Sequence, residues 1–401
     1  MAFCVGAVHT GANQAPMDPT TTTTPFHDVL VVGAGPAGLA TAACLTPLGL
    51  DVKLIDRALE QASSWRHHYE RLHLHTVKTH SALPGLPFPD NVPRYVPRQG
   101  VVDYLLAYAR HHGLRPELGH EVVAIEPAPA GSVARWHATT AAGQGFSARH
   151  VVVATGANRK PVGPELPGQA DFGGRILHSR SYRNASPFAG QRVLVVGMGN
   201  TGAEIALDLV ENKVRTALSV RSPVNIVLRD VLGRPTQLSS IALSKLPAAW
   251  GDALAVVLRN LTVGDLSRYG LQTAPHSPLR QLREDGRTPV IDVGTVQRIK
   301  AGDIQIYPGI QTLTPGGVRF AGGEEHPFDV VLLATGYDAA LRELFPRTAL
   351  PLDERGMPPG TVGVGALEGV YFVGFDVRQP GGLLRSIGLQ ARAVAQDLAR
   401  A

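Results

Sequence analysis

Two glycine-rich turns of identical spacing occur in this chain of 401 residues, and together they leave few folds open. They are Gly33-Ala-Gly-Pro-Ala-Gly38 and Gly197-Met-Gly-Asn-Thr-Gly202, and each lies between a short β-branched apolar run and a helix-forming segment. In that context the first glycine permits the tight turn, the second lets a pyrophosphate approach the backbone, and the third lets the helix pack on the strand. We therefore expect an α/β protein with two Rossmann-like dinucleotide-binding domains.

The segments around the turns predict two βαβ units. Strand, helix and strand are expected at 28–33, 36–48 and 52–56, and again at 192–197, 201–210 and 218–221. Further strands are expected at 136–140, 151–154, 330–334 and 370–374, and helices at 101–112, 241–261 and 383–399. Residues 63–100 are rich in His, Pro and aromatic residues, which indicates a long irregular segment over the ligand.

The residue that ends the second strand of each unit differs between the two units. Asp56 ends the first, and an acid there accepts hydrogen bonds from ribose hydroxyls, which suits FAD. Arg221, followed by Ser222, has the corresponding place in the second. An arginine binds a ribose 2′-phosphate that an acid would repel, so the second turn predicts NADPH rather than NADH. A solvated surface arginine is the alternative for Arg221.

Two different dinucleotides in one chain imply electron transfer between them. We expect residues 27–162 and 326–401 to form a discontinuous FAD-binding domain, into which an NADPH-binding domain at 163–325 is inserted. Residues 1–26 include a run of threonines and are expected to form a disordered leader.

Two later glycines, Gly156 and Gly336, each follow an apolar strand in an Ala-Thr-Gly context, where the chain turns beside a cofactor or simply crosses between domains. The residues expected to contact one or other cofactor are Gly33, Gly35, Pro36, Ala37, Gly38, Asp56, Arg57, Trp65, Gln99, Val123, Thr155, Gly156, Gly197, Gly199, Asn200, Thr201, Gly202, Arg221, Ser222, Thr335, Gly336 and Tyr337.

Composition excludes several other classes. The net charge of +5 comes from scattered basic residues rather than runs, which disfavours nucleic-acid binding. No apolar stretch is long enough to span a bilayer. The two cysteines, Cys4 and Cys44, exclude a disulfide framework, favour a cytoplasmic setting and form no CxxC of a dithiol flavoenzyme.

A motif between the two turns carries a family resemblance. Phe172-x-Gly174-x-x-x-His178-x-x-x-Tyr182 matches the FxGxxxHxxx(Y/F) fingerprint of class B flavin monooxygenases. The chain further resembles their YUCCA branch, the indole-3-pyruvate monooxygenases, from about residue 28 to its end. The segments that carry this second resemblance are 65–95, 97–99, 288–294 and 299–304.

The resemblance implies three candidate catalytic residues: His75, Lys78 and His178. His178 would lie where the domains meet and help to coordinate NADPH binding with oxygen chemistry. Animal-type relatives have an asparagine beside the flavin in an Asn-x-x-Lys context, and His75 precedes Lys78 at that spacing. Either a chemical or a structural role is open for His75. No third ligand accompanies His73 and His75, so no metal site is expected.

The resemblance also implies the reaction. NADPH would reduce FAD, and a (hydro)peroxide would form at flavin carbon 4a. It would convert a 2-oxo acid such as indole-3-pyruvate to the shortened acid, indole-3-acetate, with loss of carbon dioxide, as in auxin biosynthesis. Arg71, Lys78 and Arg94 are candidates to hold the substrate carboxylate.

Three other functions stay open at this stage. They are N- or S-oxygenation of a small soft nucleophile, an NADPH oxidase or flavin reductase without oxygenated product, and a regulatory protein with inactive flavin chemistry. The expected partners are a small-molecule substrate and O2, and a homodimer is one open arrangement.

Overall fold

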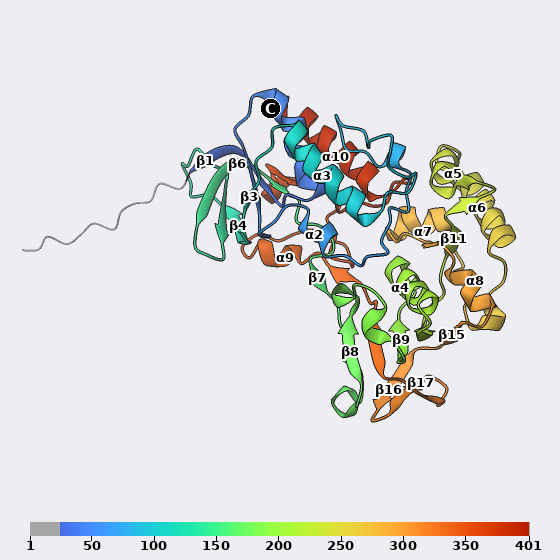
Figure 1. Cartoon of the computed structure of the whole chain (residues 1–401). Coiled ribbons are helices and arrows are strands. Elements are labelled where there is room, and N and C mark those ends of the chain that lie inside the picture. The colour runs from blue at the N-terminus through green and yellow to red at the C-terminus, as the bar shows by residue number, and fades with distance from the viewer. Residues whose placement is uncertain (1–24, 401) are drawn as a thin grey trace, which may run out of the picture.

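Two separate sheets, one for each glycine-rich turn, form the framework of the molecule (Figure 1). The computed structural model describes residues 25–400. The expected leader at 1–26 therefore lies almost entirely outside the described residues, and strand β1 already begins at Phe26. The prediction of an α/β protein with two dinucleotide-binding folds is confirmed.

The first sheet has the strand order β3-β2-β1-β6-β5-β4, with β21 paired to β6. β1 is parallel to β2 and β6, and its residues 29–32 are buried because helices cover one face and aromatic residues the other. The strands are β1 Phe26–Val32, β2 Val52–Asp56, β3 Glu117–Leu118, β4 Val122–Pro127, β5 Trp136–Thr140, β6 Gly145–Val153 and β21 Val370–Phe372.

The second sheet is parallel throughout, with the order β15-β10-β9-β19-β8. Its strands are β8 Arg175–His178, β9 Arg192–Val196, β10 Arg215–Ser219, β15 Ile304–Tyr307 and β19 Val330–Leu333. The expected return to the first domain at residue 326 is wrong. The apolar run 330–333 completes the second sheet between β9 and β8.

The chain crosses between the domains in two adjacent linkers. Strand β7, Lys160–Pro161, leads into the second domain, and β20, Tyr337–Asp338, leads back. The two strands pair antiparallel. Because the crossings are hydrogen-bonded to each other, the two covalent connections of the inserted domain lie side by side.

Helices far apart in the sequence lie together beside the first sheet, among them α3 in teal and α10 in red in Figure 1. They are α1 Pro36–Leu45, α3 Arg98–His111 and α10 Leu383–Leu398, and α1 packs against α10. The hydroxyl of Tyr108 on α3 donates to the Pro84 carbonyl at 2.6 Å and so holds the irregular segment 63–100 against this core. Helices α4 Asn200–Glu211 and α8 Thr295–Lys300 pack together beside the second sheet.

The remaining elements lie outside the two main sheets. The helices are α2 Ser63–Arg66, α5 Thr236–Leu243, α6 Ala248–Thr262, α7 Pro278–Asp285 and α9 Leu341–Leu344. The short strands are β11 Ile226–Leu228, β12 Asp230–Val231, β13 Arg234–Pro235, β14 Val290–Asp292, β16 Ile310–Thr314, β17 Gly317–Phe320 and β18 Glu325–Pro327. The 3-10 turns are Thr46–Leu48, Lys78–His80, Gln169–Asp171, Ser179–Ser181, Ser186–Phe188, Ser267–Tyr269 and Gly365–Leu367.

Helices α5 to α7 form an inserted unit at the edge of the molecule (Figure 1). The inward face of α6 buries Gly251, Ala255 and Arg259, whereas Trp250 and Leu261 on its outer face are 71% and 78% exposed. The single helix expected at 241–261 is thus replaced by two, α5 and α6, and α6 packs internally on one face only.

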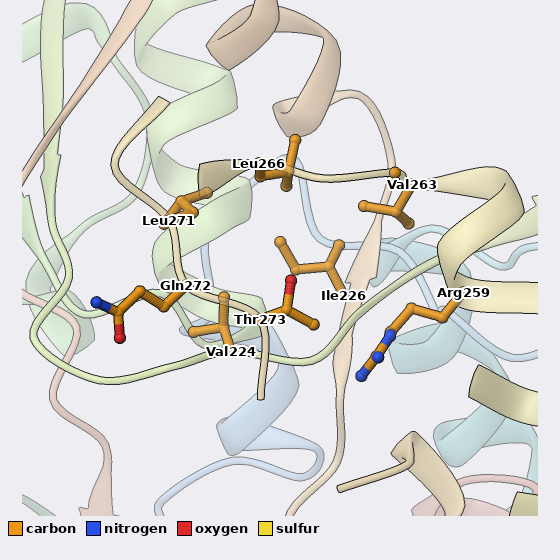
Figure 2. A pocket seen from close by; sticks show the side chains of 9 residues that line it. Val224, Ile226, Arg259, Val263, Leu266, Leu271, Gln272 and Thr273 are labelled. Carbon is orange, nitrogen blue, oxygen red and sulfur yellow. The ribbon is translucent and has the colours of Figure 1, made fainter. Parts of the chain in front are cut away.

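A small cavity lies inside this unit, and Arg259 lies at its edge (Figure 2). Its Nη1 donates to Asn225 Oδ1 at 2.7 Å and to the Ala274 carbonyl at 3.1 Å. Arg259 therefore ties the unit together. Among the described residues, no helix has the length and apolar character that crossing a bilayer requires.

Candidate active site

The first glycine-rich turn is packed tightly on two sides and open in the middle. Gly33 has φ +107° and donates its N–H to the Ile55 carbonyl at 2.8 Å, and a Cβ there would overlap the Ala154 carbonyl. A Cβ on Gly38 would overlap the Gly33 carbonyl, whereas a Cβ on Gly35 would meet no atom within 4 Å. The helix can therefore approach the strand only with glycine at both ends of the motif.

The open side of this turn faces the amino end of α1. Gly35 is its N-cap, no side chain caps the helix, and Pro36 occupies the first turn. Uncapped N–H groups and the positive end of the helix dipole suit a pyrophosphate. Ala37, one residue on, is buried against Gly374, at the end of β21.

The second turn repeats this geometry. Gly197 has φ +100°, and its N–H donates to the Ser219 carbonyl at 2.9 Å. A Cβ on Gly202 would overlap the Gly197 carbonyl, and a Cβ on Gly199 would again meet nothing within 4 Å. Gly199 is the N-cap of α4, without a side-chain cap, and Thr201 lies in the first turn of this helix. The residues at both turns fit a bound dinucleotide.

The residues at or just after the end of the second strand of each βαβ unit differ in charge, as the sequence indicated. Asp56 accepts the Ala34 N–H at 2.6 Å through Oδ2 and the Ala58 N–H at 2.8 Å through Oδ1. Each oxygen keeps a lone pair for a ribose hydroxyl. The neighbouring Arg57 is exposed, 3.7 Å from Glu121.

Arg221 lies two residues beyond the end of β10, which is shorter than expected at this end. Both Arg221 and Ser222 are exposed, and Arg221 makes no hydrogen bond or ion pair with any residue between 25 and 400. Its guanidinium can therefore take an anion without first leaving a protein partner.

The side chain of Asn200 bonds to the protein backbone and not, as expected, to a cofactor. Its Nδ2 donates to the Pro289 carbonyl at 3.2 Å, and its Oδ1 accepts the Ile291 N–H at 2.7 Å. The side chain therefore fastens the start of α4 to strand β14, and only the backbone of Asn200 stays available to a nucleotide.

The other residues expected near FAD are scattered over the first domain. Trp65 packs against the core beside α1, and Thr155 has a buried hydroxyl without a partner among the described residues. Gly156, at φ +79°, borders open space. Gln99 is exposed and donates to Asp103 at 2.9 Å, and Val123 is 43% exposed where β4 slips in register. Of this group, Thr155 is the one whose buried hydroxyl lacks a partner within residues 25–400 and is left for a ligand.

His178 ends β8 at the place where the linkers cross. Its Nε2 donates to the Gly336 carbonyl at 3.1 Å, and its Nδ1 accepts the Arg180 N–H at 3.1 Å. Burial lowers the pKa of the His178 imidazole, so the ring is held neutral with both nitrogens engaged. The ring of Tyr337 packs edge-on at 5.1 Å, and the Thr335 hydroxyl donates to the Val162 carbonyl.

Lys78 does not fit a catalytic role. Its Nζ donates to the carbonyls of Pro89, Asp90 and Val92 at 3.1, 2.9 and 2.8 Å. These three bonds use all three N–H groups of the ammonium. The lysine therefore holds a loop of segment 63–100 in place.

The other two candidate carboxylate ligands are also engaged. Arg71 forms an ion pair with Glu211 on α4, and Arg94 donates to the Gly233 carbonyl at 3.2 Å. The expectation that Arg71, Lys78 or Arg94 holds a substrate carboxylate therefore lacks support.

His75 lies between the domains, and its partner is one that the sequence analysis missed. Its Nε2 is 3.2 Å from the carboxylate of Glu204, which is itself 4% exposed and accepts the hydroxyl of Tyr69. An acid between Ala203 and Ile205, in the apolar part of the helix that follows Gly202, was the available signal for Glu204. The side chain of His73 points elsewhere, with Nδ1 at 2.6 Å from the Arg71 carbonyl.

The amino end of α10 completes the surroundings of His75. A Cβ on Gly382, the N-cap of this helix, would touch Thr76. Gln237 on α5 accepts the Val77 N–H at 2.7 Å and donates to the Gly381 carbonyl at 2.6 Å. Three segments far apart in sequence thus meet at the residues that follow His75.

Comparisons with known proteins agree with this architecture. A family model described as flavin-binding monooxygenase-like matches residues 27–346. Indole-3-pyruvate monooxygenase YUCCA1 of Oryza sativa subsp. japonica is 37% identical over 383 residues, 92% of this chain and 90% of that protein. YUCCA4 of the same plant, also an indole-3-pyruvate monooxygenase, is 36% identical over 406 residues, 98% and 92% of the two chains. The flavin-containing monooxygenase from Stenotrophomonas maltophilia has the same fold, with a TM-score of 0.71 at 24% identity over 94% of this chain and 99% of that one.

Two open glycine-rich turns on two linked sheets define a flavoprotein that passes electrons between two nucleotides. The chain belongs to the flavin-binding monooxygenase-like family. It is an FAD-dependent monooxygenase that takes its electrons from NADPH, and its resemblance to the YUCCA branch is confirmed.

Substitution by alanine should have different effects at the middle and the last glycine of the first turn. We expect Gly35→Ala to fold normally, because its φ of −75° suits alanine and the Cβ meets open space. Its affinity for FAD should fall by about tenfold or more, since the methyl group occupies the pyrophosphate side. Gly38→Ala should instead lower the unfolding temperature. Flavin titration and thermal unfolding of the flavin-free chains measure both effects, and unchanged FAD affinity in Gly35→Ala would contradict the assignment.

Proposed function

We propose that this monooxygenase converts a 2-oxo acid, with indole-3-pyruvate as the first candidate, to the carboxylic acid shortened by its carboxyl carbon. The support is the identity of 36–37% along nearly the whole length of two indole-3-pyruvate monooxygenases. The balanced reaction takes the 2-oxo acid, dioxygen, NADPH and a proton to the shortened acid, carbon dioxide, water and NADP⁺.

The geometry that carries this proposal is the pair of open turns. Bound FAD and NADPH supply the hydride transfer and the activation of dioxygen. We propose that the turn 33–38 with Asp56 and Thr155 holds FAD, and that the turn 197–202 with Arg221 holds NADPH. His178 would keep the linkers in register while both are bound.

The proposed domain limits follow the observed crossing rather than the expected one. FAD would be bound by residues 27–162 and by the chain from Tyr337 onward. NADPH would be bound by the inserted residues between them, strand β19 included.

A cation for the substrate carboxylate is still required, and we propose Arg385. It is partly buried in the first turn of α10 and makes no hydrogen bond or ion pair within residues 25–400. Its Cδ lies beside Gly381, which also borders Ile241 of α5. The neighbouring Gly382 borders Thr76, the residue after His75, so the arginine lies where segment 63–100, α5 and α10 meet.

Product identification tests the proposed reaction. Purified holoenzyme is incubated with NADPH and either indole-3-pyruvate or a thioether amine, and products are identified by mass. We expect indole-3-acetate in an amount close to the NADPH consumed. A sulfoxide or N-oxide product without indole-3-acetate would replace the substrate assignment, and hydrogen peroxide alone would point to an oxidase.

Arg385→Gln should weaken binding of the carboxylate substrate. A charge-assisted hydrogen bond contributes about 1.5–3 kcal/mol, so we expect KM for indole-3-pyruvate to rise by about tenfold or more. The matched control is Arg392→Gln, an exposed arginine two turns along the same helix. Equal KM values for the two variants would remove Arg385 from the substrate site.

The Arg221→Ala variant should lose the preference of the enzyme for NADP⁺ over NAD⁺. Because the guanidinium would pair with the 2′-phosphate, we expect the affinity for NADP⁺ to fall by about tenfold and that for NAD⁺ to change little. Titration calorimetry on the oxidised holoenzyme measures both. Arg215→Ala, at the other end of β10, is the control, and a parallel loss for NAD⁺ would contradict the role.

For the setting, we propose a cytoplasmic enzyme whose partners are a small organic substrate and dioxygen, without nucleic acid. The scattered basic residues and the free thiol of Cys44 support this.

A further inference from the structure

Glu204 is an acidic side chain in an unusual place. It lies on α4, and its neighbours in this helix, Ala203 and Ile205, are at most 2% exposed. A buried carboxylate is costly unless hydrogen-bond donors surround it. Two donors do so here: the Tyr69 hydroxyl reaches Oε2, and His75 Nε2 lies 3.2 Å from Oε1.

The two donors come from the other domain. Tyr69 and His75 belong to segment 63–100 of the FAD side, whereas Glu204 follows Gly202 in the helix whose amino end forms the second turn. Arg71 reaches the same helix through Glu211, and the Glu70 N–H donates to the Arg183 carbonyl at 2.8 Å. Segment 69–75 is therefore attached to the second domain along its length.

Within this attachment the two ring nitrogens of His75 have different hydrogen-bonding roles. A carboxylate only accepts hydrogen bonds, so a bond from His75 to Glu204 requires the hydrogen on Nε2, the ring nitrogen that faces it. Burial, reinforced by the Glu204 carboxylate, raises the pKa of the Tyr69 hydroxyl well above its ordinary range, so Tyr69 also stays a donor. The second ring nitrogen, Nδ1, is buried and has no partner among the described residues.

An unpartnered buried nitrogen is costly, so a fixed one in an active site points to a ligand group that bonds to it. The next residue, Thr76, touches Gly382 at the amino end of α10. Nδ1 is thus held where segment 63–100 meets both the second domain and the last helix.

We propose that Glu204 and Tyr69 are positioning residues. They hold His75 with its hydrogen on Nε2, so that Nδ1 presents a hydrogen-bond acceptor to a bound cofactor or substrate. Because Glu204 is carried by α4, the location of this acceptor follows the helix that receives the NADPH phosphates. Occupancy of the second turn is therefore transmitted to His75, and by linkage the state of His75 affects nucleotide affinity.

The tautomer of His75 is measurable without turnover. Holoenzyme with ¹⁵N-labelled histidine is recorded by NMR in the oxidised state, and the His75 signals are assigned with His75→Gln. We expect a neutral ring protonated on Nε2, and a change in its signals when NADP⁺ is added. A ring protonated on Nδ1, or a His75 signal indifferent to NADP⁺, would overturn the proposal.

Two variants separate positioning from general packing. Glu204→Gln keeps the shape but brings a donor as well as an acceptor, so we expect a mixture of His75 tautomers and loss of the response to NADP⁺. Tyr69→Phe, which keeps the carboxylate, should retain Nε2 protonation and weaken NADP⁺ binding by about threefold to tenfold, as the coupling of two sites allows. If Glu204→Gln does not fold, the Tyr69→Phe variant and the spectrum of the unsubstituted enzyme still test the proposal.

The matched control is Glu211→Gln, which removes the other carboxylate that ties α4 to segment 63–100. It should leave the His75 tautomer and its response to NADP⁺ unchanged. Equal effects of Glu204→Gln and Glu211→Gln would mean that any loosening of α4 perturbs His75. None of these outcomes depends on which substrate the enzyme oxidises, so the product assay can fail while this proposal stands.

Discussion

Contact between backbone atoms at the two glycine-rich turns is the constraint on which the rest of the structure depends. The carbonyls of Gly33 and Gly197 lie where a Cβ on Gly38 or Gly202 would be. This approach brings the amino end of each helix to the carboxyl end of its strand, with N–H groups uncapped and the middle glycine facing open space. Each turn thereby becomes a site for a dinucleotide phosphate, and two such sites in one chain make electron transfer between them possible.

A second requirement is that the two sites keep a defined relation to each other. The paired linkers meet this in part, with His178 bonded to the returning one. Segment 63–100 adds a further attachment, because it starts from the first domain and inserts Tyr69 and His75 against Glu204 of the second. A buried carboxylate suits this purpose, since moving α4 away would leave its charge without donors in an apolar surrounding.

The sequence analysis failed where a side chain's partners lie outside its own helix, strand or turn. Lys78 is spaced like a residue beside a flavin, yet its ammonium is saturated by carbonyls at 89–92. Asn200 follows the middle glycine of a nucleotide turn, yet its amide holds strand β14. The run 330–333 looks like any buried strand, and its membership of the second sheet depends on which neighbours it meets. Spacing along the chain contains no information of this kind.

The sequence by itself determined the class of the protein: two βαβ units, their glycine turns, an acid at one strand end and an arginine at the other, and the order of the domains. These features act within about thirty residues, where backbone geometry leaves little choice. Only the tertiary structure decided that Glu204 faces His75, that Arg71, Lys78 and Arg94 are engaged, and that Arg385 has no polar partner within residues 25–400. Apart from the Lys78 bonds within segment 63–100, these pairings join segments more than a hundred residues apart, and many different packings are compatible with the same local pattern.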